Sequence, residues 1–286
     1  FFLEKQVLDI MELVPVYYQI WGLILYFVHG TLGDSHFHER LTYSEGQWET
    51  EVEGVLVEPG PCHLEIFDSS RISQDFFLDQ LAYKAPFVLR HVTNNAKFRA
   101  LVNRDHLVKH WGHKTVTLSS ANSYSYEKKK VLLEDYLETM MGPASPTKLA
   151  NETFYFFGDN DVDEWNDLFK EYILPPLNLP RHRSALSFGI AGPGTGVPFH
   201  YHGPGFAETL IGRKRWFLTA PNHIPEFHPN KTTLQWFLED YDRVKKEVQI
   251  LECTIQPGDI IYFPDKWWHA ILNIDTSVFM STFLSP

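Results

Sequence analysis

The sequence lacks the features that would point to nucleic-acid binding or nucleotide chemistry. Its 25 basic residues are outnumbered by 36 acidic residues, which gives a formal net charge of −11. Because a nucleic-acid footprint needs a basic stripe, we expect no nucleic-acid partner. A basic cluster occurs at residues 128–130, which we interpret as a solvated approach to a helix. No GxxxxGK(S/T) phosphate loop occurs, and no serine or cysteine triad can be assembled.

Cysteine is also scarce. Cys62 and Cys253 are the only two, and no Cys-x-x-Cys or mixed Cys/His spacing is present. We therefore expect no structural zinc site of that kind. The two residues fit either a pair of buried free thiols or one disulfide in a secreted protein, and the sequence leaves both open.

The apolar content, by contrast, is sufficient for a packed fold. Hydrophobic residues make up 44% of the chain and aromatic residues 15%, which is far from the composition of a disordered protein. A length of 286 residues suits one large domain or two small ones. There is no internal repeat and no low-complexity tract.

Residues 1–35 have the pattern of a leader. Within them, residues 13–28 form a run without a charge, which is shorter than the roughly 20 residues that a membrane helix needs. The run matches the apolar core of a signal peptide or signal anchor, and Gly30 and Gly33 offer small residues for cleavage. A buried amphipathic helix is the alternative. We expect contact with a membrane only if the leader is not cleaved.

Two Asn-x-Thr sequons, at Asn151 and Asn230, are candidate glycosylation sites. Each sequon alone carries little information, because such triplets arise often by chance. Together with the leader and the two cysteines, they predict a glycoprotein in the lumen of the endoplasmic reticulum.

The chain between the leader and residue 183 divides into two parts. Residues 36–60 are polar and rich in Glu and Gly, and they have the composition of a linker. Residues 61–183 are mixed and mostly helical. Capping residues and apolar periodicity predict helices over residues 73–83, 94–111, 131–141 and 162–173, with strands over 86–91 and 114–119.

Residues 184–286 have a different character, because short apolar segments alternate with Gly and Pro turns. Many short strands with regular turns predict a mostly antiparallel β-barrel or sandwich. One helical pattern, at residues 233–246, interrupts them and could form a lid or a dimer surface. The expected strands span residues 184–190, 197–202, 206–219, 248–255, 259–263, 268–273 and 276–284.

Three histidines carry the candidate chemistry. His200 and His202 are two apart in an expected strand, so the alternation of a strand places both side chains on one face. His269 follows 67 residues after His202, in another expected strand. Neutral imidazoles are common ligands of first-row metals. If the three converge, they form a site for a divalent ion such as Fe(II) or zinc.

The stretches that hold these histidines resemble a known family. GTGVPFHYHGPGFAETLIGRKRW, GRKRWFLTAP and GDIIYFPDKWWH together resemble the JmjC domain of the 2-oxoglutarate oxygenase superfamily. The resemblance implies a mainly β fold with helices, a double-stranded β-helix (cupin) that follows a helical N-terminal region. It also implies that Lys214 and Tyr155 bind the cosubstrate 2-oxoglutarate. The stretches ANSYSY, YFFGDN and HPNKTTL are most similar to members of the endoplasmic-reticulum type.

The chain departs from the family at one metal ligand. The family pattern is His-x-Asp/Glu…His, a face of two histidines and one carboxylate for Fe(II), and His202 takes the carboxylate position. The ligand set thereby loses a negative charge, which weakens the inference of ordinary oxygenase activity. Glu208 offers a replacement carboxylate if its strand runs regularly to Lys214, because the two side chains would then share a face. The alternative is that Glu208 pairs with Lys214 or Arg213.

Three functions are compatible with these features. The one we expect is a luminal JmjC-like protein without ordinary hydroxylase activity, which acts by binding other proteins in signalling or protein folding. The second is an active Fe(II)- and 2-oxoglutarate-dependent protein hydroxylase with a three-His or three-His-one-Glu centre. The third, a nuclear histone demethylase, needs the intact ligand set and basic signals that this sequence lacks. The partners are expected to be proteins, and a homo-oligomer is compatible with the sequence.

Overall fold

The computed structural model describes residues 27–28, 40–158 and 160–286. The expected leader lies outside the described residues, except for a short strand β1 (Phe27–Val28) that pairs with β2. Within the described ranges, none of the helices has the length and apolar character that crossing a bilayer requires.

Two facing sheets form a barrel. The larger sheet has nine strands in the order β4-β5-β13-β10-β15-β9-β8-β6-β7, and the smaller has the order β12-β11-β14. The described pairings in both sheets are antiparallel apart from β4 with β5. The strands are β4 (Glu65–Phe67), β5 (Phe87–Arg90), β6 (Thr115–Ser120), β7 (Lys128–Leu132), β8 (Phe154–Phe157), β9 (Arg183–Ala191), β10 (Gly205–Ile211), β11 (Lys214–Thr219), β12 (Leu251–Ile255), β13 (Asp259–Phe263), β14 (Trp268–Asn273) and β15 (Ser277–Ser285).

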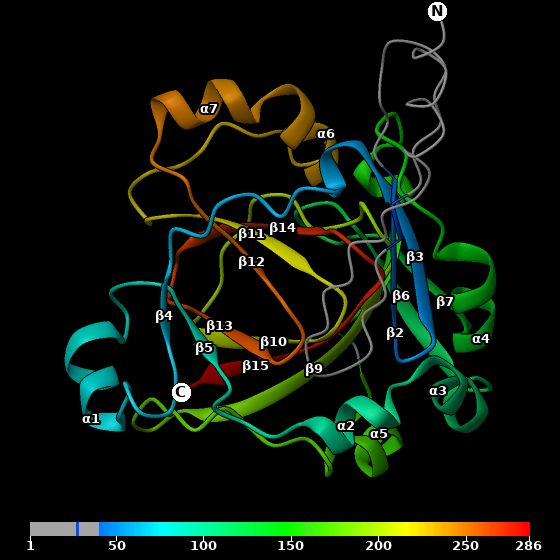
Figure 1. Cartoon of the computed structure of the whole chain (residues 1–286), viewed down its shortest axis with the longest axis horizontal. Coiled ribbons are helices and arrows are strands. Elements are labelled where there is room, and N and C mark those ends of the chain that lie inside the picture. The colour runs from blue at the N-terminus through cyan, green and yellow to red at the C-terminus, as the bar shows by residue number, and fades with distance from the viewer. Residues whose placement is uncertain (1–26, 29–39, 159) are drawn as a thin grey trace, which may run out of the picture.

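Helices cover the outer faces of both sheets. Figure 1 shows α6 and α7 on the side of β11, β12 and β14, and α1, α2 and α5 on the opposite side, beyond β9, β10 and β15. The helices are α1 (Gln74–Phe76), α2 (Ala96–Leu101), α3 (Arg104–Trp111), α4 (Leu133–Asp135), α5 (Val162–Phe169), α6 (Thr233–Glu239) and α7 (Tyr241–Glu247). Single turns add η1 (Gly54–Leu56), η2 (Phe77–Leu81), η3 (Tyr136–Met140) and η4 (Ala150–Glu152).

The apolar core lies in three layers. Between the sheets, Trp216, Ile261 and Phe263 pack with neighbouring apolar side chains. Outside the larger sheet, two clusters join its strands to the N-terminal helices. Outside the smaller sheet, Phe217 and Trp236 belong to a cluster that joins it to α6 and α7. The mainly β fold with packed helices that the sequence predicts is therefore confirmed.

Residues 36–60 were expected to form a linker, but residues 40–53 within them form a β-hairpin. Strand β2 (Arg40–Glu45) pairs antiparallel with β3 (Trp48–Glu53), and Gly46 and Gln47 turn the chain with φ of 55° and 63°. Burial alternates strictly along β3, and the Trp48 indole donates to the Val102 carbonyl at 3.0 Å. The glutamates at the exposed positions make the segment polar in composition, although its period of two is that of a strand.

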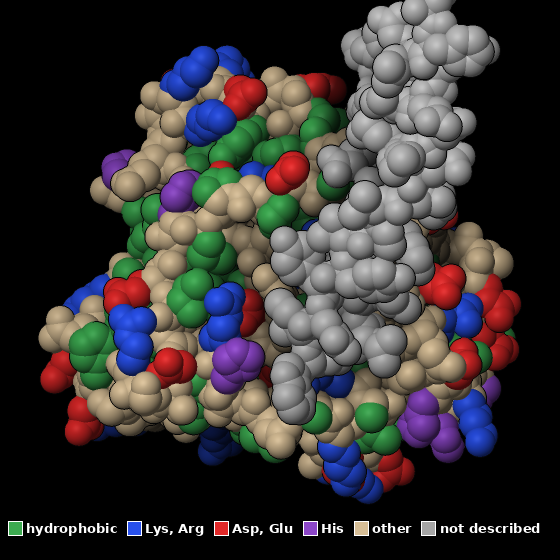
Figure 2. Space-filling model, viewed as in Figure 1, with side chains coloured by type: hydrophobic (Ala, Val, Ile, Leu, Met, Phe, Trp, Pro, Cys, Tyr) green, Lys and Arg blue, Asp and Glu red, His purple; other side chains and the backbone are tan. Residues whose placement is uncertain are grey.

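One helix expected in the N-terminal part is wrong. The helix expected over residues 94–111 is two helices, because the Asn103 side chain accepts the Asp105 N–H and starts α3 as a new element. The basic run at 128–130 is exposed and leads into α4, as expected, and it lies in strand β7. Residues 61–183 also contribute β4 to β8 to the large sheet. Figure 2 shows basic and acidic side chains interspersed on the face in view.

Candidate metal centre

His200 and His202 do not lie in a regular strand, contrary to expectation. Residues 197–202 form only an isolated bridge with β14, in which the His200 N–H donates to the His269 carbonyl at 3.1 Å and the His269 N–H donates back at 2.8 Å. The bridge, rather than strand alternation, brings the rings together. The ligand atoms of all three histidines lie within 4.8 Å of one another. The expected convergence is thus present.

Backbone carbonyls fix the orientation of all three rings. Each Nδ1 lies 2.8 to 2.9 Å from a carbonyl oxygen, and because a carbonyl only accepts, each Nδ1 carries the proton. The lone pair is then on Nε2, and the Nε2 atoms of His202 and His269 are 3.1 Å apart. The accepting carbonyls belong to Pro198 for His200, Gly203 for His202 and Trp267 for His269. This arrangement orients metal-binding histidines elsewhere, so the donor set fits a divalent cation.

Burial keeps the three imidazoles neutral. It lowers the pKa of His200 to about 4, with a further contribution from His202. Burial also lowers the pKa of His202 and takes the pKa of His269 well below its usual value. At neutral pH all three rings are therefore in the form that binds metals.

The histidines line a cavity between the two sheets. Lys214 enters it from β11 and Tyr155 from β8, as the family resemblance implies, and both are buried. Burial takes the pKa of Lys214 well below its usual value, and its Nζ lies 3.1 Å from the centre of the Phe279 ring. No carboxylate lines the cavity within the described part of the chain. The remaining lining residues are Phe157, Gly196, Val197, Trp216, Phe263, Ile271, Asn273, Phe279, Ser281 and Phe283.

Glu208 does not belong to this site, and both expectations for it are wrong. Its Oε2 accepts hydrogen bonds from Asn95 Nδ2 at 2.7 Å and from the Tyr172 hydroxyl at 2.9 Å, on the helical side of the large sheet. The regular strand expected over residues 206–219 is in fact two strands, because the chain turns at Gly212 and β11 continues in the other sheet. Side-chain parity is lost across that turn, so Glu208 and Lys214 face different spaces.

Sequence analysis did not name most of the polar and aromatic wall residues, among them Asn273, Phe279 and Ser281. Asn273 lines the cavity from β14, and Phe279 and Ser281 line it from β15. Asn273 has the same parity as His269 along β14, so counting in twos from the histidine would have found it.

The two cysteines are joined. Cys62 and Cys253 form a disulfide that closes a separation of 191 residues. The bridge fastens the segment before β4 to strand β12, where the His63 N–H also donates to the Glu252 carbonyl at 2.8 Å. Of the two possibilities that the sequence leaves open, the structure contains the disulfide.

The two sequons, far apart in sequence, meet in space. The Asn151 N–H donates to Asn230 Oδ1 at 2.8 Å. The Asn151 carboxamide oxygen is buried without a hydrogen-bond partner. The Asn230 sequon belongs to the segment that leads into α6, and the Asn151 sequon lies against it.

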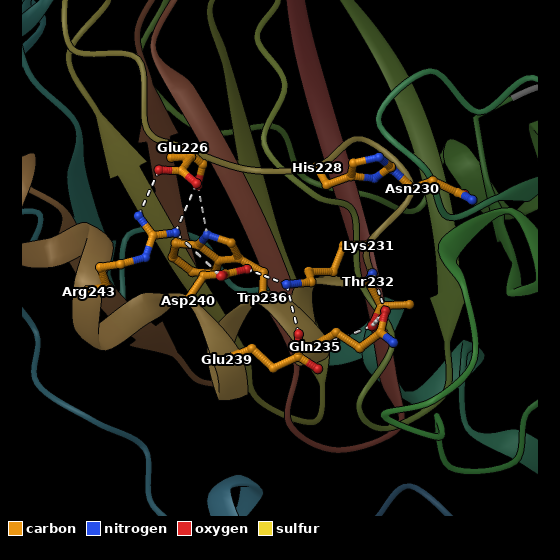
Figure 3. Close-up of polar contacts among 10 residues, drawn as sticks. All are labelled: Glu226, His228, Asn230, Lys231, Thr232, Gln235, Trp236, Glu239, Asp240 and Arg243. Atoms are coloured by element: carbon orange, nitrogen blue, oxygen red, sulfur yellow. Dashed lines mark hydrogen bonds and ion pairs between the residues drawn. The ribbon is translucent and has the colours of Figure 1, made fainter.

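That segment, residues 222–232, packs next to the histidines and is held by ion pairs. Its Phe227 contacts Phe199 and Trp268, which precede His200 and His269 in the chain. Figure 3 shows the two clamps: Glu226 pairs with Arg243 of α7, and Lys231 pairs with Glu239 and Asp240. The partners of the first clamp are 65% and 46% exposed, so it adds little stability by itself.

Residues 73–284 match the family described as Cupin-like domain, and this match agrees with the architecture. The Escherichia coli ribosomal oxygenase YcfD, solved with cobalt and 2-oxoglutarate, has a TM-score of 0.45 and 18% identity, covering 75% of this chain and 52% of that one. This chain thus spans about half of that structure.

Sequence relatives match over more of the chain. JmjC domain-containing protein 8 of Mus musculus is 49% identical over 243 residues, which covers 84% of this chain and 90% of that protein. The Homo sapiens protein of the same name is 48% identical over 240 residues, with the same coverage. Lysine-specific demethylase JMJ21 of Arabidopsis thaliana is 28% identical and covers 72% of this chain, but only 24% of that protein is matched. The chain therefore belongs to the cupin-like JmjC family, in the company of JmjC domain-containing protein 8.

Proposed function

We propose that this protein is a luminal protein of the endoplasmic reticulum that binds a divalent metal in its JmjC pocket and acts by binding other proteins, without ordinary hydroxylase activity. The observation that carries the proposal is the donor set. Three neutral imidazoles converge in the cavity, and no carboxylate lines it among the described residues.

The chemistry of this donor set sets it apart from an ordinary JmjC centre. His200, His202 and His269 would hold the metal through Nε2, since their Nδ1 atoms are engaged with carbonyls. A bound divalent ion would supply Lewis acidity there. Without an anionic ligand, the site favours zinc, for which three histidines are a common ligand set, over the two-His-one-carboxylate preference of non-haem Fe(II).

The disulfide and the sequons support the luminal part of the proposal. Disulfides persist in oxidising compartments and are rare in the cytosol, and Cys62 and Cys253 are bonded. A glycan on Asn151 or Asn230 would require passage through the same compartment. If endoglycosidase treatment leaves the electrophoretic mobility of the protein unchanged, and fractionation finds the protein in the cytosol, this part is contradicted.

The enzymatic part is tested by succinate release. Purified wild type, His202→Asp and Glu208→Ala are loaded with Fe(II) and supplied with 2-oxoglutarate, and succinate and bound metal are measured. We expect no release above the His269→Ala background from wild type. His202→Asp should raise Fe(II) affinity and uncoupled turnover, because it restores an anionic ligand. Glu208→Ala should behave like wild type, since Glu208 lies outside the cavity.

An active oxygenase is the second candidate, favoured by one observation. Lys214 and Tyr155 both line the cavity with the histidines, as cosubstrate binding would require. If wild type with Fe(II) releases succinate and Lys214→Met abolishes that release, this candidate replaces the first. Lysine is the right residue to test, because a bound dicarboxylate would supply the counter-charge that favours the ammonium form of this buried side chain.

A further inference from the structure

Strand β7 is the last strand of the nine-stranded sheet and presents an open edge. It pairs with β6 alone among the described residues, and four of its five residues are exposed. Figure 1 shows it at the outer margin of the sheet, beside β6. An edge strand of this kind displays backbone donors and acceptors that another strand can use.

The alternation of hydrogen bonds between β6 and β7 shows which backbone groups of β7 are available to a further strand. The Ser120 N–H donates to the Glu127 carbonyl, and the Leu133 N–H donates to the Lys114 carbonyl, both at 2.9 Å. Bonded positions alternate along an antiparallel pair, so the residues of the same parity as 127 and 133 are directed at β6. The backbone groups at positions 128, 130 and 132 therefore face away from β6.

The edge is basic in an acidic protein. Lys129 and Lys130 are exposed, and neither forms an ion pair within the described ranges, while the chain as a whole carries a net charge of −11. Beside them on the loop that enters β7, Tyr124 and Tyr126 are 60% and 72% exposed and stack with ring centres 5.1 Å apart. The edge thus combines positive charge with an exposed aromatic surface.

Lysines on an edge strand can also serve to keep sheets from pairing with one another. Two exposed, stacked tyrosines work against that purpose, because they add contact surface of the kind that interfaces use. The combination fits a partner that is extended and negatively charged. A neutral or basic strand would gain the backbone bonds but would lose the charge complementarity.

We propose that β7 is the docking strand for an extended acidic segment of another protein, which adds to the sheet as a further strand. This inference rests on the proposed protein-binding function and names the class of segment that it takes. The docked strand would continue the sheet that forms one wall of the cavity, because Lys128 pairs with Ser119 and Ser119 pairs with Tyr155. With strands about 4.8 Å apart, it would lie roughly 14 Å from Tyr155.

The test measures the binding of two acidic probe peptides to the full chain by fluorescence anisotropy. One fluorescein-labelled peptide of about ten residues alternates Glu and Thr and can add as a strand. The other alternates Glu and Pro, has the same charge and cannot donate backbone hydrogen bonds at its prolines. The charge variant is Lys129→Glu with Lys130→Glu. Its matched control is Lys245→Glu with Lys246→Glu, which makes the same charge change at an exposed pair on α7.

A second variant, Leu132→Pro, removes one outward N–H without a charge change. Leu132 has φ of −68° and ψ of 145°, which proline adopts readily. Circular dichroism and the unfolding midpoint establish that each variant is folded before binding is compared.

We expect the Glu-Thr peptide to bind wild type and the α7 control alike. Its affinity should fall about tenfold in the β7 charge variant and several-fold in Leu132→Pro. Equal binding of the Glu-Pro peptide, or equal binding of the Glu-Thr peptide to wild type and the β7 charge variant, would overturn the inference. So would an absence of binding to folded wild type. The metal and succinate assays do not involve β7, so they test the proposed function of the pocket independently of this inference.

Discussion

The Nε2 atoms of His202 and His269 lie 3.1 Å apart, and the Nδ1 of each ring is held by a backbone carbonyl. Both Nε2 atoms are therefore acceptors in the neutral rings, and neither can donate to the other. Two lone pairs at this distance repel unless a cation lies between them. The backbone thus arranges the histidines in a geometry that a bound divalent ion stabilises.

Cobalt binding tests this arrangement. Wild type should bind about one Co(II) per chain with a visible absorption band. His269→Ala should lower the affinity by at least about tenfold, because one of three ligands is lost. His228→Ala is the matched control, since that histidine is in the 222–232 segment outside the ligand group. Equal affinity of His269→Ala and wild type would show that the ion binds elsewhere.

The buried carboxyl of Glu208 predicts a pH dependence of stability. Burial raises its pKa to about 7, partly offset by hydrogen bonds from Tyr172 and Asn95. When a carboxyl has a higher pKa in the folded state than in the unfolded state, its protonated form favours folding. This contribution is fully present below the unfolded-state pKa near 4.5, and it is lost as the pH rises through the folded-state pKa of about 7. Relative to wild type, Glu208→Gln should gain about 2–3 kcal/mol between pH 5 and pH 8. Urea unfolding at four pH values measures it, and parallel curves for the two proteins would contradict it.

The barrel could be predicted from the sequence because strand length, turn residues and alternation are local. His269 and Lys214 could also be assigned to the site, because the stretches that hold them resemble a known family. The hairpin at 40–53 was missed for a related reason. Its exposed positions carry glutamates, and composition outweighed the period of two.

The misplacement of Glu208 has a different cause. Parity holds only within one strand, and the chain changes sheets at Gly212. That residue has φ of 75°, and a Cβ there would meet the Thr276 carbonyl oxygen at 2.2 Å. The turn is therefore made by glycine at a close backbone approach. Where two segments meet across the fold is a tertiary property, so the disulfide and the contact between the sequons could not be deduced from spacing.

The ion pair between Arg213 and Asp275 predicts a large loss of stability on mutation. Arg213 donates from Nε at 2.7 Å and from Nη2 at 2.9 Å to the two carboxylate oxygens, and both side chains are buried. Asp275→Asn removes the charge of the buried carboxylate that the guanidinium contacts, so the free energy of unfolding should fall by about 3–5 kcal/mol. The matched control is Glu226→Gln at the exposed pair with Arg243, which should change the free energy of unfolding far less because solvent screens that pair. Similar losses in the two variants, measured by urea unfolding, would contradict this assignment.

The disulfide predicts that stability depends on reduction. The bridge between Cys62 and Cys253 closes 191 residues of chain, so it restricts the unfolded state strongly and should contribute about 2–5 kcal/mol. Adding a reductant should lower the melting temperature of wild type by about 5–15 °C, on the scale expected for a chain of this size. The double variant Cys62→Ser with Cys253→Ser should melt at the lower temperature with or without reductant, because it has no bridge to lose. If wild type melts at the same temperature in both conditions while mass spectrometry shows that its thiols are free, the bridge makes no contribution. The contacts of His63 with β12 would then be sufficient to hold the segment before β4 in place.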